Sequence, residues 1–397
     1  MATVTAASAS PRRRKLEDGR PAVKGIVAWR AAIAVAALFA GATVVATARF
    51  NARVALDDAR ERVEHGTPPN DPAIQALVRQ ALRRDLTQPA ALELTALADE
   101  NRGHPQAAAR LYRLSDQISR RSLATRLWLV QDAVGRGDVA GTLANMELAL
   151  RTSSAAPAFV FPALARGLDD AKLVQPIATL VERPSDWREA FLIFAADNAD
   201  PSSAAALFFA VHDRRLISKD ELDRKVVVRL VGDGQFTLAR QLDTAFGGRP
   251  VRAQLVPDGN FDDFAARYPF GWGLTERAEL GAARQIDDGH SVLAFHATVA
   301  EGGQVAAQLL TLPPGSYALE TQAGREKRLD SPPLWTLSCA APARLVVTLA
   351  LPSEPHARSR ASFAIPPDCP AQWLALTVRP ALTPQSGSVQ EVTVAAR

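Results

Sequence analysis

The chain contains 397 residues, 47% of them hydrophobic, which is enough for roughly two or three folded domains with sizeable cores. Its formal net charge is +4, and residues 1–25 carry this excess, with six basic residues against two acidic ones. The rest of the chain is neutral, which argues against nucleic-acid binding, because that function needs positive charge concentrated on the folded domain. The abundance of alanine and arginine is typical of GC-rich bacterial genomes.

The N-terminal region predicts a membrane anchor. Residues 1–25 have almost no bulky apolar side chains, so we expect a disordered, basic cytoplasmic tail. Residues 26–49 are predominantly apolar, with no charge from Ala31 to Ala48, and can cross ~30 Å of hydrocarbon as one transmembrane helix; Arg30 lies near the N-terminal end, where its side chain can reach the headgroups. Because the basic cluster precedes this segment, the positive-inside rule places the N-terminus in the cytoplasm.

Two other interpretations of the apolar segment stay open. Ala46-Thr47-Ala48 has the small-x-small form of a signal-peptide cleavage site, and the segment could also be a buried helix of a globular domain. An anchor and a signal peptide both place the remaining chain outside the cytoplasm. We therefore expect a single-pass protein of the bacterial inner membrane with its bulk in the periplasm.

Residues 50–248 have a helical pattern. Asp71 is expected to cap a helix that begins at Pro72 and has one apolar face. NRGHPQAAARLYRL (residues 101–114) and GRGDVAGTLANMEL (residues 135–148) then superpose at a shift of 34 residues. In each copy a glycine, Gly103 or Gly137, follows one apolar helix and precedes the next, and Gly234 has the same role in a weaker third copy.

These copies resemble the tetratricopeptide-repeat family, whose helix–turn–helix unit has this period. The resemblance covers about residues 70–248 and implies an α-solenoid with Gly103, Gly137 and Gly234 at its turns. Repeats of this type bind and scaffold, so the resemblance implies protein partners rather than catalysis. Residues 155–200, which contain four prolines, are irregular and leave room for a degenerate helix pair.

Residues 249–397 change to short alternating segments separated by proline, glycine and aspartate, which predicts an antiparallel β-sandwich. Pro313-Pro314-Gly315 is expected to form the turn of a hairpin. The predicted strands cover residues 291–299, 305–312, 316–324, 334–340, 343–351, 361–367, 372–380 and 388–396.

This module opens with NFDDFAARYPFGWGL (residues 260–274), continues through QLLTLPPGSYALETQAG and ends with SGSVQEVTVAAR. These segments resemble the jelly-roll domains of carbohydrate-binding modules and galactose-binding-like folds. The resemblance implies glycan binding, for which Trp272, Trp335 and Trp373 are the candidate contacts, although all three also fit a hydrophobic core. Gln390-Glu391 replaces the usual final acidic pair of the family, which puts a structural Ca²⁺ site in doubt.

The sequence contains no motif that indicates catalysis, a cofactor or a metal site. Its six histidines are scattered, and no phosphate-binding loop, nucleophile elbow or metal-binding histidine pair is present. We therefore expect a non-catalytic protein. The three-part architecture resembles bacterial proteins of exopolysaccharide assembly and export, which implies partner proteins of that machinery. The alternatives are a dedicated carbohydrate-binding protein, an enzyme with an appended module, or an envelope adaptor unrelated to sugar.

The two cysteines, Cys339 and Cys369, both lie in the predicted sandwich beside strands that carry tryptophan. In an oxidising periplasm they are expected to form a disulfide. A buried pair of free thiols and a metal site are the alternatives.

Overall fold

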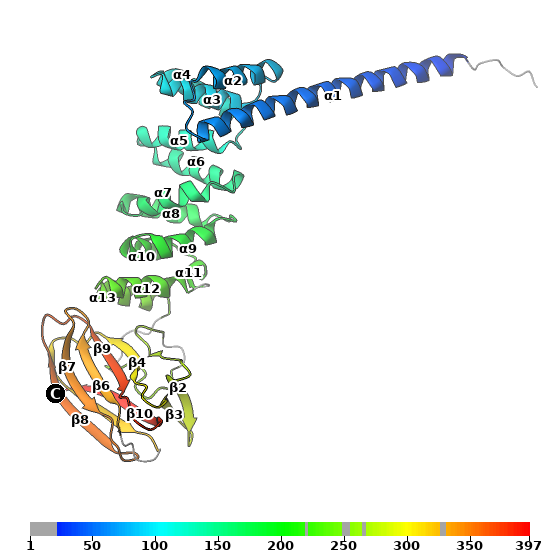
Figure 1. Ribbon diagram of the computed structural model, residues 1–397. Helices are drawn as coiled ribbons and strands as arrows, with labels where there is room; N and C mark the ends of the chain where they lie inside the picture. Colours follow the sequence, from blue (N-terminus) through cyan, green and yellow to red (C-terminus); the bar gives the residue numbers. More distant parts are fainter. Residues whose placement is uncertain (1–21, 219–220, 248–254, 264–266, 326–330) are drawn as a thin grey trace, which may run out of the picture. The chain divides into compact units, whose positions relative to one another are not determined.

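The computed structural model describes residues 22–218, 221–247, 255–263, 267–325 and 331–397, with the side chains of residues 22–41 and 44 excepted. Over these residues the chain forms 13 helices and two five-stranded antiparallel sheets, which confirms the multidomain α plus β class (Figure 1). Two compact units, residues 1–138 and 139–397, are described in turn. Residues 1–21 of the predicted tail and the predicted boundary at residues 248–249 lie outside the described residues.

The first unit is entirely helical over its described residues. Asp71 caps its second helix as predicted, because its carboxylate accepts a hydrogen bond from the Ala73 N–H at 2.7 Å and a proline occupies the first turn. The helices are α1 (Ala22–Glu64), α2 (Pro72–Arg84), α3 (Pro89–Asn101), α4 (Pro105–Ile118) and α5 (Leu123–Gly135).

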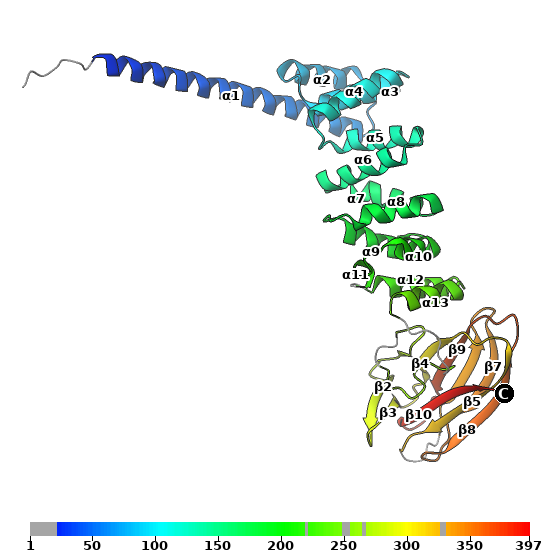
Figure 2. The ribbon, with the colours of Figure 1, turned by 180° about the vertical axis from the view of Figure 1, so that it is seen from behind.

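Helix α1 is one unbroken helix of 43 residues. Its C-terminal part packs on α2 and α3, while its N-terminal part extends well beyond α2, α3 and α4 (Figure 2). In the part of the chain that the structure describes, no helix combines the length and hydropathy of a membrane span. Most side chains of the predicted span over residues 26–49 lie outside the described residues, so the anchor stays a prediction.

The second unit begins with further helices whose inward faces are apolar. Phe191, Leu192, Leu207 and Phe208 are completely buried between them. These helices are α6 (Val139–Thr152), α7 (Pro157–Gly167), α8 (Ala171–Glu182), α9 (Arg188–Asn198), α10 (Pro201–Ala210), α11 (Arg215–Ser218), α12 (Leu222–Gly232) and α13 (Phe236–Ala245).

The three predicted turn glycines have the same local geometry. Gly103, Gly137 and Gly234 have φ values of 79°, 69° and 73°, and an added Cβ would meet nothing within 4 Å at any of them. The residue after each glycine donates its N–H five residues back, as His104 does to the Asp99 carbonyl at 2.8 Å. This is the Schellman ending of a helix, and it needs glycine for its left-handed backbone rather than for space.

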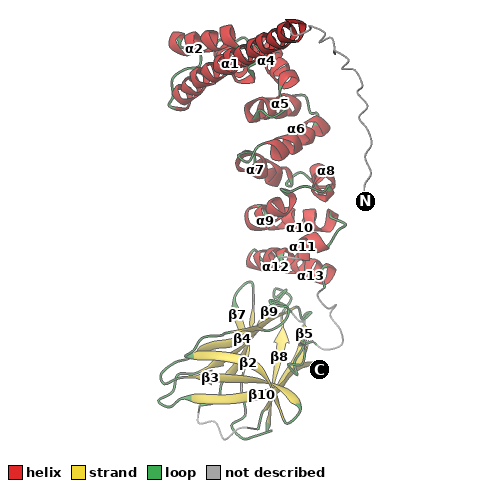
Figure 3. Cartoon of the chain, turned by 90° about the vertical axis from the view of Figure 1, so that its right-hand side faces the viewer, coloured by secondary structure: helices red, strands yellow, loops and turns green. Residues whose placement is uncertain are grey.

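The remainder of the second unit is a β-sandwich (Figure 3, strands in yellow). One sheet, here called the β9 sheet, has the order β1-β4-β9-β6-β7, and the other, the β10 sheet, has the order β2-β3-β10-β5-β8. The strands are β1 (Gly273–Leu274), β2 (Leu280–Asp287), β3 (His290–Ala297), β4 (Gly303–Leu310), β5 (Gly315–Ala323), β6 (Leu334–Cys339), β7 (Arg344–Ala350), β8 (Arg358–Ile365), β9 (Gln372–Val378) and β10 (Gln385–Ala396).

The predicted hairpin around Pro313-Pro314-Gly315 is wrong. Strand β4 pairs with β1 and β9, whereas β5 pairs with β10 and β8, so the turn connects the two sheets instead of two neighbouring strands. Pro313 and Pro314 have no N–H to donate to a ladder, which disfavours strand pairing at this point. The Tyr317 hydroxyl donates to the Pro313 carbonyl at 2.8 Å and holds this connection.

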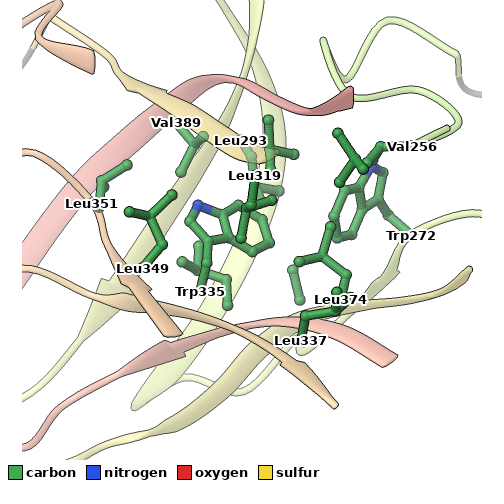
Figure 4. Packing of buried hydrophobic residues seen from close by; sticks show 14 of the residues in the cluster. Val256, Trp272, Leu293, Leu319, Trp335, Leu337, Leu349, Leu351, Leu374 and Val389 are labelled. Carbon is green, nitrogen blue, oxygen red and sulfur yellow. The ribbon is translucent and has the colours of Figure 1, made fainter. Parts of the chain in front are cut away.

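Between the sheets lies one hydrophobic core with Trp335 at its centre (Figure 4). The disulfide predicted between Cys339 and Cys369 is present, and both cysteines are buried at the edge of this core. It connects the end of β6 to the segment that leads into β9. The disulfide therefore joins two neighbouring strands of the β9 sheet at the same end of the sheet.

Candidate functional site

Most of the aromatic side chains that the structure describes in the sandwich are buried. The exceptions are Tyr268 and Trp373, which keep part of their surface exposed and stack on each other with ring centroids 6.0 Å apart and planes 21° apart. The buried ones are Phe261, Phe270, Trp272, Phe295, Tyr317, Trp335 and Phe363. A flat aromatic surface open to solvent in the described sandwich is therefore confined to this pair.

Two of the three tryptophans predicted to contact glycan are core residues. Trp335 is 0% exposed and donates its indole N–H to the Thr321 hydroxyl at 3.0 Å. Trp272 is 6% exposed, donates to the Asp258 carbonyl at 2.9 Å, and packs against the Trp335 ring (Figure 4). Trp335 is completely enclosed, so the prediction of glycan contact is wrong for it, whereas Trp272 is almost completely buried but lines the first of the clefts described below. Trp373 remains a candidate.

Tyr268, which the sequence analysis did not single out, is positioned by the loop between Arg267 and Trp272. The Leu309 N–H on β4 donates to the Pro269 carbonyl at 2.8 Å, which ties this loop to the β9 sheet. The Tyr268 ring lies against Gly273, where an added Cβ would stand 2.5 Å from the ring. Gly273 is thus required by the close approach of Tyr268, and the ring is held between the glycine and Trp373.

Arg267, the residue before Tyr268, anchors the same loop to the last two helices of the unit. Its guanidinium contacts the buried Asp223 carboxylate at 2.6 Å and the Asp243 carboxylate at 3.6 Å. Beside it, the Arg240 guanidinium lies 3.7 Å from the centre of the Phe270 ring, a cation–π contact. Burial raises the pKa of Asp243, and the neighbouring charges of Arg267 and Arg240 oppose this shift.

Two clefts adjoin at Thr275, Glu276 and Ala283, which line both. The first cleft, of about 830 Å³, runs past Tyr268 and Arg284. The second, of about 540 Å³, has a floor of small residues such as Ala294 and Gly387. Its polar wall is formed by Glu276, Arg277, Gln285, His296 and Ser386. We call the two clefts together the β2 groove.

A buried ion pair supports the floor of the β2 groove. The Arg284 guanidinium donates to the Asp258 carboxylate at 2.6 Å and to the Asp263 carbonyl at 2.9 Å, while the Asp263 N–H donates to Asp258 at 2.7 Å. Burial raises the pKa of Asp258 to about 6, although the Asp263 N–H and the Arg284 charge act in the opposite direction. The pair thus fixes Arg284 in the wall of the groove. Burial of the charged Asp258 carboxylate costs free energy, and this cost falls when Asp258 is protonated.

A pH dependence of stability follows from Asp258. Its pKa in the folded chain lies above the ordinary value of 3.8. Between these two pKa values the folded state therefore keeps a proton that the unfolded state has released. The free energy of unfolding of the sandwich is therefore expected to rise by roughly 2 kcal/mol as the pH falls from about 7 to about 4. Urea unfolding at a series of pH values measures this slope. Asp258→Asn removes the titrating group, and an unchanged slope in that variant would contradict the assignment.

The β2 groove offers the interactions that a neutral polar chain needs. Exposed aromatic faces stack on flat apolar surfaces, and the amide, hydroxyl, imidazole and charged groups of the wall donate and accept hydrogen bonds. Glu276 is the carboxylate common to both clefts. Among the residues with described side chains, no group of three or more metal-ligating side chains could hold a metal ion.

Comparison with known proteins assigns no family. No family model matches this chain, and no curated protein matches it. Among solved structures, TmCBM61 in complex with β-1,4-galactotriose is 12% identical, with a TM-score of 0.27, over 37% of this chain and 100% of that chain. The CBM22-1 xylan-binding domain from Paenibacillus barcinonensis Xyn10C is 9% identical, with a TM-score of 0.24, over 32% and 85% of the two chains.

A third similar structure is the enzymatically active domain of tailspike protein 4 from bacteriophage CBA120, at 10% identity and a TM-score of 0.28. The match covers 36% of this chain but only 21% of the tailspike chain. Scores this low carry no argument about what the chain does. The C-terminal sandwich has structural neighbours among carbohydrate-binding modules, and the assignment goes no further than that.

Proposed function

We propose that this chain is a non-catalytic glycan-binding scaffold of the bacterial inner membrane, acting in exopolysaccharide biosynthesis or export. Residues 26–49 anchor it, the helices form tetratricopeptide-like repeats that bind partner proteins, and the β-sandwich binds glycan in the β2 groove. The observation that carries the glycan part is the Tyr268–Trp373 pair. Tyr268 lines the first cleft, and Trp373, which lines neither cleft, stacks on Tyr268 and extends its exposed aromatic surface.

Removal of either ring should weaken glycan binding. Tyr268→Ala and Trp373→Ala are each expected to lower affinity about tenfold, because a lost aromatic stacking contact is worth about 1 kcal/mol or slightly more. The measurement is affinity electrophoresis of the full chain in detergent through gels that contain a neutral β-glucan, a galactan or alginate. Ile286→Ala is the control, since Ile286 is an exposed side chain of β2 that lines neither cleft.

The result also separates the proposal from its alternatives. If the wild-type chain is retarded by a polysaccharide and the two aromatic variants are not, the groove is a binding site. If no polysaccharide retards the wild type, the chain is better described as an envelope adaptor unrelated to sugar. Turnover of a retained polysaccharide would contradict the non-catalytic part.

The adaptor alternative has an observation of its own. Phe159 on α7, Ile193 on α9 and Val228 on α12 are large apolar side chains exposed to solvent, and they recur at nearly the repeat spacing. Equivalent positions on successive repeats form a continuous stripe, the kind of surface on which solenoids hold a partner. This stripe supports the protein-binding part of the proposal whether or not the sandwich binds sugar.

A further inference from the structure

The second helix of the first unit ends beside the point where α1 leaves the packed helices. Ala52, Leu56 and Ala59 of α1 are buried against Ile74, Val78 and Ala81 of α2. The Arg49 guanidinium contacts the Asp85 carboxylate at 3.5 Å, just after α2 ends. Two segments distant in sequence, residues 49–54 and 83–86, therefore form one surface, which we call the exit patch.

The exit patch exposes large apolar side chains. Phe50 is 66% exposed and Leu86 is 77% exposed, and Val54 is also exposed one turn beyond Phe50. Single exposed apolar residues are common, but Phe50 and Leu86 directly follow Arg49 and Asp85, the two residues whose side chains contact each other. Apolar side chains interspersed with arginines are typical of surfaces that lie in the headgroup region of a bilayer.

The exit patch is also strongly basic. Arg49 and Arg53 on α1, and Arg83 and Arg84 on α2, all have exposed side chains, and the exposed Arg79 lies one turn before Arg83, at the border of the patch. The one carboxylate among them is Asp85, which contacts Arg49 and is hydrogen-bonded by Thr87. Arg53, Arg79, Arg83 and Arg84 form no ion pair within the described part of the chain, so their charges remain available to an anionic partner.

The direction of α1 indicates which anionic partner. The helix is continuous from Ala22 to Glu64, so no flexible linker separates the apolar segment over residues 26–49 from the exit patch. We infer that the exit patch docks on the anionic headgroups of the bilayer that holds α1, with Phe50 and Leu86 entering the interface. This inference rests on the anchor in the proposed function. It adds a second contact, which fixes the first helical unit against the membrane surface.

The test places a fluorophore at residue 86. The full chain carrying Leu86→Cys is labelled with an environment-sensitive NBD group without reductant, because the Cys339–Cys369 disulfide leaves no other thiol. It is reconstituted into nanodiscs of phosphatidylcholine, with or without phosphatidylglycerol. In discs with phosphatidylglycerol, we expect blue-shifted emission and protection from aqueous iodide. Val134→Cys, an exposed apolar position on α5 in the same unit, is the control and should be quenched equally in both discs.

Charge variants test the role of the arginines. Arg83→Glu with Arg84→Glu should return the probe at residue 86 to a water-like emission, since each arginine near an anionic surface favours binding about fivefold. Arg83→Gln with Arg84→Gln should give an intermediate result without reversing charge at the end of the helix. Arg110→Glu changes an exposed arginine of α4 and leaves the exit patch intact, so it should have no effect on the probe.

Two outcomes distinguish the inference from the anchor itself. Alkaline extraction of membranes tests the anchor separately. If alkali fails to extract the chain but the probe at residue 86 is quenched as fully as the one at residue 134 in phosphatidylglycerol discs, the anchor is supported and the docking of the exit patch on lipid is contradicted. If alkali removes the chain while the probe at neutral pH is protected, the patch binds lipid and the anchor is wrong.

Discussion

Trp335→Ala is expected to lower the free energy of unfolding of the β-sandwich by about 3–5 kcal/mol, because it leaves a large cavity at the centre of the core. The side chain is completely buried, and it fills the space between the two sheets beside Leu337, Leu349 and Leu374 (Figure 4). The change also leaves the Thr321 hydroxyl without the indole donor. A loss of this size is a large part of the total stability of an ordinary domain.

Hydrogen exchange of strands β6 and β9 in the full chain, followed by mass spectrometry across a urea series, measures this loss. Trp373→Ala is the matched control, since Trp373 lies on the neighbouring strand β9 but is partly exposed. The two variants should affect different quantities: Trp335→Ala should lower stability, and Trp373→Ala should lower glycan affinity. Equal loss of stability in both would contradict the assignment of Trp373 to the surface.

The disulfide gives the second large effect. Cys339→Ala with Cys369→Ala should lower the free energy of unfolding by about 3–4 kcal/mol, because a closed loop of this length restricts the unfolded chain. The two cysteines are separated by 30 residues, and both are buried. Each substitution also removes a buried sulfur atom from the core, so reduction of the wild-type chain is needed to separate the effect of the cross-link from that of packing.

Urea unfolding with and without dithiothreitol supplies the control for this prediction. The reductant should destabilise the wild-type chain by a similar amount and leave the double alanine variant unaffected. Alkylation of the unreduced, denatured wild type should find no free thiol. Two free thiols would exclude the cross-link in the protein as purified.

The strands of the sandwich illustrate what local pattern can predict. All eight predicted strands are present within a few residues, because alternating apolar positions between proline and glycine turns report directly on burial. Strand β2 (Leu280–Asp287) was missed, since LGAARQID places alanine and arginine where β-branched residues are expected. Strand β2 pairs with β3 over its whole length, and this pairing stabilises an extended conformation that its own sequence does not favour.

The helical region shows a similar division between pattern and context. The glycine turns were identifiable because only glycine adopts their backbone at little cost. Residues 155–200, an irregular stretch that left room for a degenerate helix pair, form α7, α8 and α9, with Pro162 and Pro176 inside helices. Each proline removes one backbone hydrogen bond, and burial of the surrounding apolar faces outweighs that loss.

The candidate site was predicted only in part, because exposure is a property of the fold and not of a residue type. Trp272, Trp335 and Trp373 occupy similar apolar runs, and nothing in their neighbours distinguishes the one that reaches the surface. Tyr268 was missed for a related reason. Its role depends on Gly273 and Trp373, and the latter is brought beside it only by strand pairing between β4 and β9.

The ion pairs of Arg267 have a thermodynamic consequence for the neighbouring aromatic ring. Arg267 contacts Asp223 and Asp243 on α12 and α13, and it directly precedes Tyr268. The loop is thus ordered when the unit folds, so its conformational entropy is not lost again when a ligand binds. Preorganisation of this kind raises affinity without adding a contact to the ligand. If the sandwich binds glycan as proposed, α12 and α13 therefore contribute to its affinity through Arg267, although the stacking pair contains none of their side chains.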